Sequence, residues 1–134
     1  MFLTKECDYG LRIIRALGDG EKKNADDICS AEFIPGQYVY KILKKLDNAG
    51  IVQSTRGRDG GYRLVMALDK FSILDVVNAI DDHLSLTECL REDSFCLRNS
   101  ISEPCAVHSE LERIQKVLLQ QLKHKTMLEV VSGV

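Results

Sequence analysis

An amphipathic segment at residues 36–49, followed directly by a glycine-rich turn, constrains the fold of this chain more than any other feature. Its apolar residues repeat at the i, i+3, i+4 and i+7 spacing of one buried helix face: Val39, Ile42, Leu43 and Leu46. The opposite face carries basic and amide side chains: Gln37, Lys41, Lys44 and Asn48. Taken alone, this element is better explained as an ordinary amphipathic helix with a solvated face, so its neighbours decide the interpretation.

Two shorter helical patterns precede this segment. Residues 3–18 place apolar side chains on one face and end at Gly18-Asp19-Gly20, while residues 25–31 follow Asn24, a residue type favoured at helix N-caps. A tight break at Phe33-Ile34-Pro35 then leads into residues 36–49. Two helices in this order, the second with a basic outer face, are typical of a helix-turn-helix whose second helix lies in a DNA major groove.

A β-hairpin is predicted immediately after the helix-turn-helix. Residues 51–55 and 62–66 are β-prone, and the turn at 56–61 contains three glycines that permit positive φ and close backbone approach. Arg56 and Arg58 at the tip can reach phosphates or a narrow minor groove. A nucleotide-phosphate loop is the alternative, but neither a Lys-Ser/Thr pair nor a helix follows the glycines. The hairpin therefore favours a wing.

The second half of the chain begins with another helix and ends with a long one. Residues 72–80 form a helical pattern with Ser72 and Asp75 at capping-box spacing, residues 81–103 lack periodicity, and Pro104 is expected in a first helical turn. An apolar stripe then runs to about residue 125: Val107, Leu111, Ile114, Leu118 and Leu122. In so short a chain we expect the same helix of a second subunit to cover this stripe, and residues 127–131 to pack back as a short helix.

These elements predict a mainly α fold with a small β-hairpin wing: a winged helix-turn-helix plus a long C-terminal dimerisation helix. We expect a DNA-binding domain at residues 1–80, a cysteine-bearing sensor loop at 81–104, and the dimerisation and C-terminal helices at 105–134. The length of 134 residues and the 45% hydrophobic content suit one soluble globular unit. We expect no signal peptide or membrane anchor, because no apolar run approaches bilayer length.

Charge and cysteine content narrow the function. The net charge is −2, yet residues 35–66 carry six basic and two acidic side chains, which suggests a local polyanion contact. Five cysteines, an odd number, point to free thiols, metal ligation or redox sensing in the reducing cytoplasm. Cys7 and Cys29 lie in apolar helical patterns and are expected in the core, whereas three others lie in or beside polar, loop-like sequence: Cys89, Cys96 and Cys105.

Four segments resemble, in this order and spacing, the Rrf2 family of bacterial winged-helix transcription regulators: LTKECDYGLRIIRAL, IPGQYVYKILKKLDNAGIV, STRGRDGGYRL and SILDVVNAI. The resemblance covers most of the chain. It implies a cytoplasmic homodimer joined by long C-terminal helices, recognition of near-palindromic double-stranded promoter DNA, and, as in many members, an iron-sulfur cluster held by three cysteines.

The resemblance also implies which residues contact DNA: Lys5, Tyr9, Gln37, Tyr38, Tyr40, Lys41, Lys44, Arg56, Gly57 and Arg58. Among these, Lys5, Tyr9, Lys44 and Arg58 are expected to hold phosphates. Base edges would be read by Gln37, Tyr40 and Lys41.

By the same resemblance, the cluster ligands would be Cys89, Cys96 and Cys105, with His108 as the fourth, since Cys105-Ala-Val-His108 repeats a family Cys-x2-His ending. A 2Fe–2S cluster is favoured over 4Fe–4S, although the cysteine spacings are longer than usual in the family. The alternatives are zinc in a Cys3His site, a thiol or disulfide switch, and cysteines without a role.

We therefore expect a DNA-binding repressor-type regulator whose operator affinity responds to iron, redox or nitric oxide status through the cluster. The alternative is a regulator of the same type without a cluster, controlled by a protein partner or by thiol oxidation. An enzyme with Cys105 as nucleophile and His108 as base is not favoured, because no third orienting group or cofactor motif accompanies the two residues.

Overall fold

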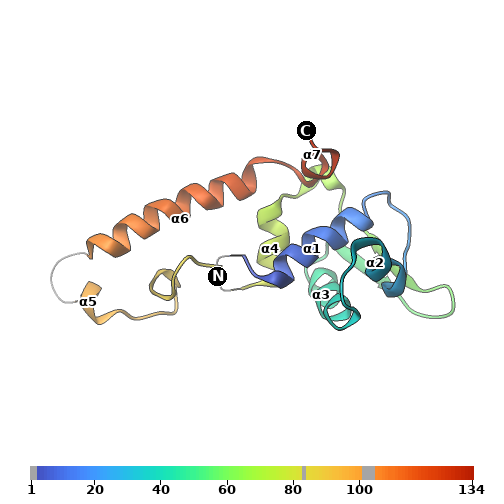
Figure 1. Cartoon of the computed structure of the whole chain (residues 1–134), viewed down its shortest axis with the longest axis horizontal. Helices are drawn as coiled ribbons and strands as arrows, with labels where there is room; N and C mark the ends of the chain where they lie inside the picture. The colour runs from blue at the N-terminus through green and yellow to red at the C-terminus, as the bar shows by residue number, and fades with distance from the viewer. Residues whose placement is uncertain (1–2, 83, 101–104) are drawn as a thin grey trace.

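The chain folds into a helical body at one end and a long helix that extends away from it, as Figure 1 shows for this computed structural model. The structure describes residues 3–82, 84–100 and 105–134. Along the chain, the elements are α1 (Lys5–Ala16), α2 (Ala25–Glu32), α3 (Gly36–Asn48), β1 (Val52–Thr55), β2 (Gly61–Leu64), η1 (Leu68–Lys70), α4 (Ile73–Ile80), η2 (Glu88–Leu90), α5 (Leu97–Ser100), α6 (Ala106–His124) and α7 (Met127–Ser132).

Polar side chains set where the first helices begin. The Thr4 hydroxyl accepts the backbone N–H of Cys7, so α1 begins at Lys5 and not at residue 3 as the apolar pattern suggested. The predicted N-cap at Asn24 is confirmed, because its side-chain oxygen accepts the N–H of Asp27 at 2.8 Å. Helix α2 ends at Glu32, and its C-cap residue Phe33 has a left-handed φ of 55° and is 88% exposed. The α2–α3 unit is the expected helix-turn-helix.

The core lies between α1, α3 and α4. The four apolar residues predicted to face inward from α3 are fully buried, and Ile13, Ile14, Val76 and Val77 meet them from α1 and α4. Gly10 lets these two outer helices approach closely, because a Cβ there would overlap the Ile80 side chain. The recognition helix candidate is therefore held rigidly on its inner face.

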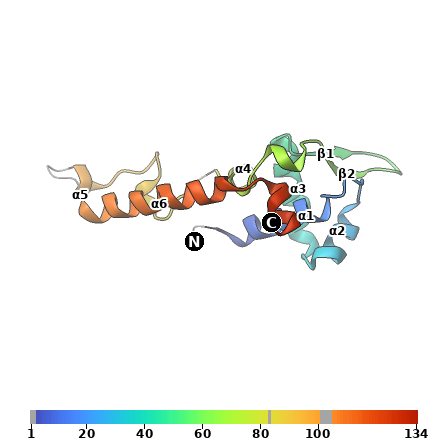
Figure 2. The ribbon, with the colours of Figure 1, turned by 90° about the horizontal axis from the view of Figure 1, so that it is seen from above.

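The hairpin expected after α3 is present as an antiparallel pair of strands. Val52 pairs with Leu64 and Thr55 with Gly61, and Figure 2 shows the hairpin extending from the body at the end opposite α5. Of the three turn glycines, only Gly57 has a positive φ, of 103°. Gly60 serves a different purpose, since a Cβ there would collide with the Thr55 carbonyl oxygen. The architecture is thus a winged helix.

The last helix returns to the body. Ser72 and Asp75 form the predicted capping box of α4, and Thr126 forms a second one with Glu129 at the start of α7. The Met127 N–H donates to the Phe71 carbonyl at 2.8 Å, and the Met127 side chain is 1% exposed. The expected packing of a short terminal helix against the body is confirmed.

Helix α6 contrasts with the body because none of its residues is buried. The segment at residues 84–100 runs beside it as two short helical turns, η2 and α5, where the sequence indicated only loop (Figure 1). Leu86 N–H donates to the Gln115 side chain of α6 at 2.8 Å.

Pro104, expected in the first turn of α6, lies outside the described residues. Within the described ranges, no helix is long and apolar enough to cross a membrane.

Candidate functional site

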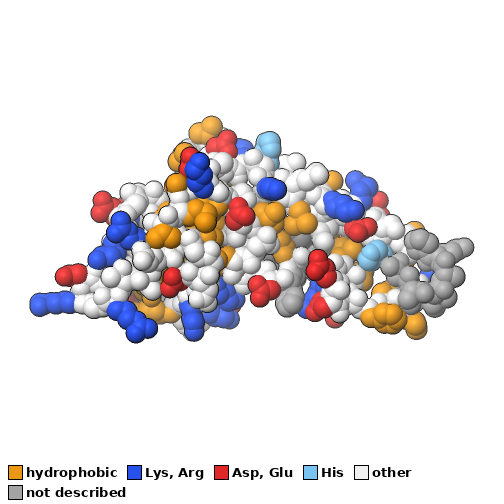
Figure 3. All heavy atoms as spheres, turned by 180° about the vertical axis from the view of Figure 1, so that it is seen from behind, with side chains coloured by type: hydrophobic (Ala, Val, Ile, Leu, Met, Phe, Trp, Pro, Cys, Tyr) orange, Lys and Arg blue, Asp and Glu red, His pale blue; other side chains and the backbone are white. Residues whose placement is uncertain are grey.

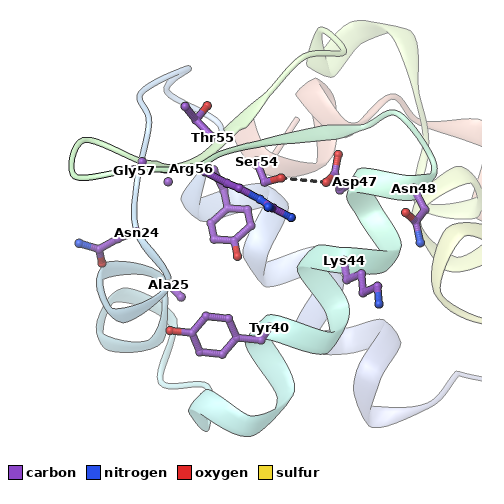
Figure 4. A pocket seen from close by; sticks show the side chains of 13 residues that line it. Asn24, Ala25, Tyr40, Lys44, Asp47, Asn48, Ser54, Thr55, Arg56 and Gly57 are labelled. Atoms are coloured by element: carbon purple, nitrogen blue, oxygen red, sulfur yellow. Dashed lines mark hydrogen bonds between the residues drawn. The ribbon is translucent and has the colours of Figure 1, made fainter.

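A groove of about 590 Å3 separates α3 from the wing. Figure 4 shows Tyr40 and Lys44 projecting from α3 on one side and Arg56 reaching over the groove from the wing on the other. Gly57 lies on the wing beside Arg56, where the chain turns with a positive φ. Four of the residues that family resemblance assigned to DNA binding therefore line one surface.

The cations around this groove are exposed and unneutralised. Lys44, Arg56 and Arg58 are exposed, and none forms an ion pair with a carboxylate in the described part of the chain. Tyr40 is 58% exposed and Gln37 is also open to solvent. Figure 3 shows Lys and Arg side chains gathering at the end of the molecule that carries the wing. Such a surface attracts a polyanion.

A side-chain hydrogen bond links the wing to the last turn of α3. Ser54 of β1 donates to the Asp47 carboxylate at 3.0 Å, as the dashed line in Figure 4 marks. Asp47 also puts one negative charge at the edge of the groove. Sequence reasoning did not identify this pair, although the seven-residue separation across a predicted turn was a usable signal.

Lys41 differs from Lys44, although both lie on the exposed face of α3. Lys41 Nζ donates to Glu6 Oε1 at 2.8 Å, and Lys45 Nζ donates to Glu6 Oε2 at 3.1 Å. Hydrogen bonds from the two lysines hold the pKa of Glu6 below its usual value, and the Glu6 bond raises the pKa of Lys41. Glu6, in the first turn of α1, is a residue that the sequence analysis missed.

Tyr9 and Tyr38, both expected to contact DNA, pack against each other. Their rings lie 5.2 Å apart at 66°, an edge-to-face contact between α1 and α3, and Arg12 lies over the Tyr9 ring. Both tyrosines are half-buried against the core, whereas Lys5 at the start of α1 is exposed. The pair lies away from the α3–wing groove, since neither ring lines it.

A second ion pair positions the helix-turn-helix. Glu32, 8% exposed at the end of α2, accepts from the Arg15 guanidinium of α1, with the Nε bond at 3.0 Å. A buried carboxylate requires such a partner, because an uncompensated charge there is costly. The pair was not foreseen from the sequence, since its members are 17 residues apart.

The structure places the cysteines in two environments. Cys7 is fully buried, as predicted, and Cys29 is half-buried against the core. Cys89 lies in η2, where the Thr87 hydroxyl is 3.3 Å from its sulfur, and Cys96 directly precedes α5. Cys105 occupies the N-cap position of α6. None of the five forms a disulfide.

Two of the four expected cluster ligands, Cys105 and His108, lie at the start of α6, and both have properties that suit metal binding. A hydrogen bond from the backbone N–H of His108 lowers the pKa of the Cys105 thiol, and the Val107 N–H adds to the effect. The Nδ1 atom of His108 is buried without a hydrogen-bond partner in the described structure. However, no three His, Cys, Asp or Glu side chains among residues 3–82, 84–100 and 105–134 come together as a metal site.

Comparison with known proteins agrees with the fold. The family model described as Rrf2, iron-dependent transcriptional regulator, matches residues 3–133. The HTH-type transcriptional regulator NsrR of Geobacillus kaustophilus is 33% identical over 88% of this chain and 84% of its own length. Two solved structures are similar in fold. T. potens IscR has a TM-score of 0.74 and 19% identity, and the match covers 97% of this chain and 85% of that one. The oxidised form of Staphylococcus aureus CymR has a TM-score of 0.75 and 22% identity, and the match covers 100% of this chain and 98% of that one.

Proposed function

This chain belongs to the Rrf2 family of transcription regulators, and from that premise we propose that it binds operator DNA as a homodimer through α3 and the wing, under control of an iron-sulfur cluster held by the 89–108 region. The observation that carries the DNA part is the groove lined by Tyr40, Lys44 and Arg56. Its cations have no described carboxylate partner, so phosphates can supply the missing charge.

The geometry supports distinct roles for the two sides of the groove. Helix α3 exposes Gln37 and Tyr40, whose polar ends can reach base edges when the helix enters a major groove. Arg56 and Arg58 on the wing can hold phosphates or enter the adjacent minor groove. Phosphate contacts would fix the register of the protein, and contacts from α3 would read the sequence.

A second copy of this chain is the partner proposed for α6. Val107 is 69% exposed, and four further members of the apolar stripe on the same face are only half-buried: Leu111, Ile114, Leu118 and Leu122. A two-fold arrangement would bury these faces against each other and place two α3 helices to meet a near-palindromic operator.

The donor set fits an iron-sulfur cluster in chemistry. Three thiols outside disulfides, one with a lowered pKa at a helix N-terminus, suit soft thiophilic iron, and His108 presents an unpartnered ring nitrogen. Cys105 and His108 would hold the cluster from α6, and Cys89 and Cys96 from the preceding segment. Binding would require these two cysteines to be brought to the start of α6, because the described side chains do not form a site as they stand.

When bound, such a cluster supplies a group whose redox state, oxidation or nitrosylation changes with the chemistry of the cell. The protein would pass this change to the DNA-binding surface through a shift in the position of its helices. The cysteine-bearing segment follows α4 and is hydrogen-bonded to α6 through Leu86 and Gln115, so its rearrangement would shift α6 relative to the winged body. In a dimer, that shift alters the spacing of the two α3 helices and hence operator affinity.

Anaerobic reconstitution with ferrous iron and sulfide tests the cluster. The parent protein should acquire visible absorbance and bind iron and sulfide in equal amounts, and Cys89→Ala, Cys96→Ala and Cys105→Ala should each lose or weaken that chromophore. Cys29→Ala is the matched control and should behave like the parent. Equal iron and sulfide in the triple variant would rule the site out, and zinc without sulfide would assign a Cys3His zinc site instead.

DNA binding needs a separate experiment on cluster-free protein. Fluorescence anisotropy with duplexes selected from a random library should show tight binding to a near-palindrome, weakening steeply as salt rises. Binding that ignores salt, or fails for every selected duplex, would remove the first half of the proposal.

One observation favours a second candidate, a regulator of the same type without a cluster. In the described residues, Cys89, Cys96 and Cys105 are not gathered as one metal site. Such a regulator would respond to thiol oxidation or to a protein partner. It predicts that peroxide treatment, and not cluster loading, changes operator affinity, and that Cys105→Ala removes this response.

A further inference from the structure

Lys41 and Lys44, on the exposed face of α3, differ in whether they form an ion pair. At 100° per residue, Gln37, Lys44 and Asn48 lie along the middle of that face, and Lys41 lies beside them. Lys44 has no ion pair in the described part of the chain, whereas Lys41 donates to Glu6 Oε1 at 2.8 Å. One helix therefore presents a lysine without a described ion pair next to a lysine that is already bonded to a carboxylate.

Glu6 is held where it is by more than Lys41. Its second oxygen accepts from Lys45 Nζ at 3.1 Å, and Lys45 also donates to the Ile80 carbonyl at 3.0 Å, at the end of α4. The Glu6 side chain is 23% exposed, and its position in the first turn of α1 favours a negative charge. Three elements thus fix this carboxylate beside the recognition face.

The contribution of the Glu6–Lys41 ion pair to folding stability is too small to explain why it is there. The Lys41 side chain is 59% exposed, and ion pairs with exposed lysines contribute only about 0–1 kcal/mol to folding. The effect on a DNA ligand is larger, because each lysine that replaces a counterion on the phosphate backbone changes affinity by roughly 10-fold at 0.1 M salt. The main consequence of the Glu6–Lys41 pair is therefore electrostatic and concerns the ligand.

We propose that Glu6 is a specificity-determining residue that withholds Lys41 from DNA of unrelated sequence. Lys41 exchanges its bond to Glu6 only for a base edge or phosphate in the operator geometry, where the other contacts of α3 fix the register. On random DNA, the Glu6–Lys41 bond remains closed, so Lys41 is not available to the phosphates. This inference rests on the proposed DNA-binding function and goes beyond it, since it assigns discrimination to a residue of α1.

Glu6→Gln tests the idea in cluster-free, full-length protein. The probes are a selected operator duplex and a scrambled duplex of the same length and composition, titrated by anisotropy between 0.05 and 0.25 M KCl, a range of roughly five-fold that resolves a change of one phosphate contact. Glu6→Gln should tighten scrambled-duplex binding by about 10-fold at 0.1 M salt and steepen its salt slope by about 0.9. Operator binding should tighten less, so the ratio of the two affinities falls.

Two further variants keep the result interpretable. Glu110→Gln removes the same charge from α6, where Glu110 pairs with Arg113, and should leave the ratio unchanged. Glu6→Gln with Lys41→Gln has the parental net charge and remains informative if Glu6→Gln alone folds poorly. This double variant should bind the scrambled duplex as the parent does and the operator more weakly.

The outcomes separate this inference from the proposed function. An unchanged affinity ratio in folded Glu6→Gln, or scrambled-duplex binding weakened about 10-fold in the double variant, would show that Lys41 is not withheld. A parent protein that binds neither duplex in a salt-dependent way would instead overturn the proposed function. Unfolding curves for each variant establish that the proteins compared are folded.

Discussion

The winged body and the α6 arm of this molecule are stabilised in different ways. Every buried hydrophobic residue that the structure describes lies between Cys7 and Ile80, apart from Met127 of α7. Helix α6, 19 residues long, buries none. The body carries its own core, whereas the arm presents an apolar stripe that only another surface can cover.

This difference separates the two activities we propose for the chain. The body needs a rigid α3 because base readout depends on fixed side-chain positions, and burial of the whole inner face of α3 provides that rigidity. The cysteine-bearing segment and α6 need to change their arrangement in response to a ligand, and weakly packed elements reorganise at low cost. The following predictions test the contrast, from the largest expected effect to the smallest.

Leu43→Ala should produce the largest loss. Leu43 is fully buried in the body, and replacing such a leucine lowers the free energy of unfolding by about 2–5 kcal/mol. The matched control is Leu128→Ala, at a leucine that is 47% exposed, where the change should stay near about 0.5 kcal/mol. Urea titration of both variants checks this. Equal losses at the two sites would contradict a core confined to the body.

Leu118→Glu should prevent formation of the proposed dimer without unfolding the body. A carboxylate placed in an apolar interface costs roughly 3 kcal/mol, which corresponds to a dissociation constant raised about 100-fold. Sedimentation velocity at micromolar concentration should then show monomers. Lys116→Glu, on the opposite face of α6 with its side chain 71% exposed, should leave the mass unchanged. A dimer that survives Leu118→Glu would show that the subunits meet elsewhere.

Lys44→Ala should weaken DNA binding by about 10-fold at 0.1 M salt, for operator and unrelated sequences alike. The physical reason is the loss of one phosphate contact, which also lowers the salt slope by about 0.9. Anisotropy titrations at several salt concentrations measure both quantities. Lys123→Ala removes the same charge from the arm, and a comparable effect there would mean that net charge, and not the groove, governs binding.

Thr126→Ala should have the smallest effect of the four. It removes the cap of α7, at the point where the chain returns from the arm to the body, and such a loss costs about 1 kcal/mol. Thermal unfolding of cluster-free protein should show a correspondingly lower Tm. Ser132→Ala, at the exposed end of the same helix, should not change it. No loss at Thr126 would indicate that the buried Met127 alone fastens α7.

Local patterns were sufficient to predict the secondary structure of the body. The apolar repeat of α3, the Asn24 cap and the Ser72–Asp75 capping box all depend on residues within one or two helical turns of each other, and the structure confirms them. The predicted helix boundaries were less accurate. Helix α1 begins two residues later than its apolar pattern suggested, because Thr4 takes the first free N–H.

The candidate site was predictable only in part. Lys44 and Arg56 could be selected from the basic face of a helix and the tip of a hairpin, and the structure brings them to one groove. The partners that modify the site were not predictable, because Glu6 meets Lys41 across 35 residues of sequence. A single such contact contributes too little free energy to leave a pattern in the sequence.

The sequence by itself determined where the helices and the hairpin form, which face of each is apolar, and which residues could carry charge or bind metal. Those properties depend on side chains a few positions apart, whose preferences add along each element. Only the tertiary structure decided that Lys41 is paired with Glu6 while Lys44 has no ion pair among the described residues, and that Glu32 is compensated by Arg15. It also decided that the described residues of the cysteine segment lie along α6 without forming a metal site. These outcomes depend on how elements distant in sequence pack together, and that packing is set by the shape of the whole core.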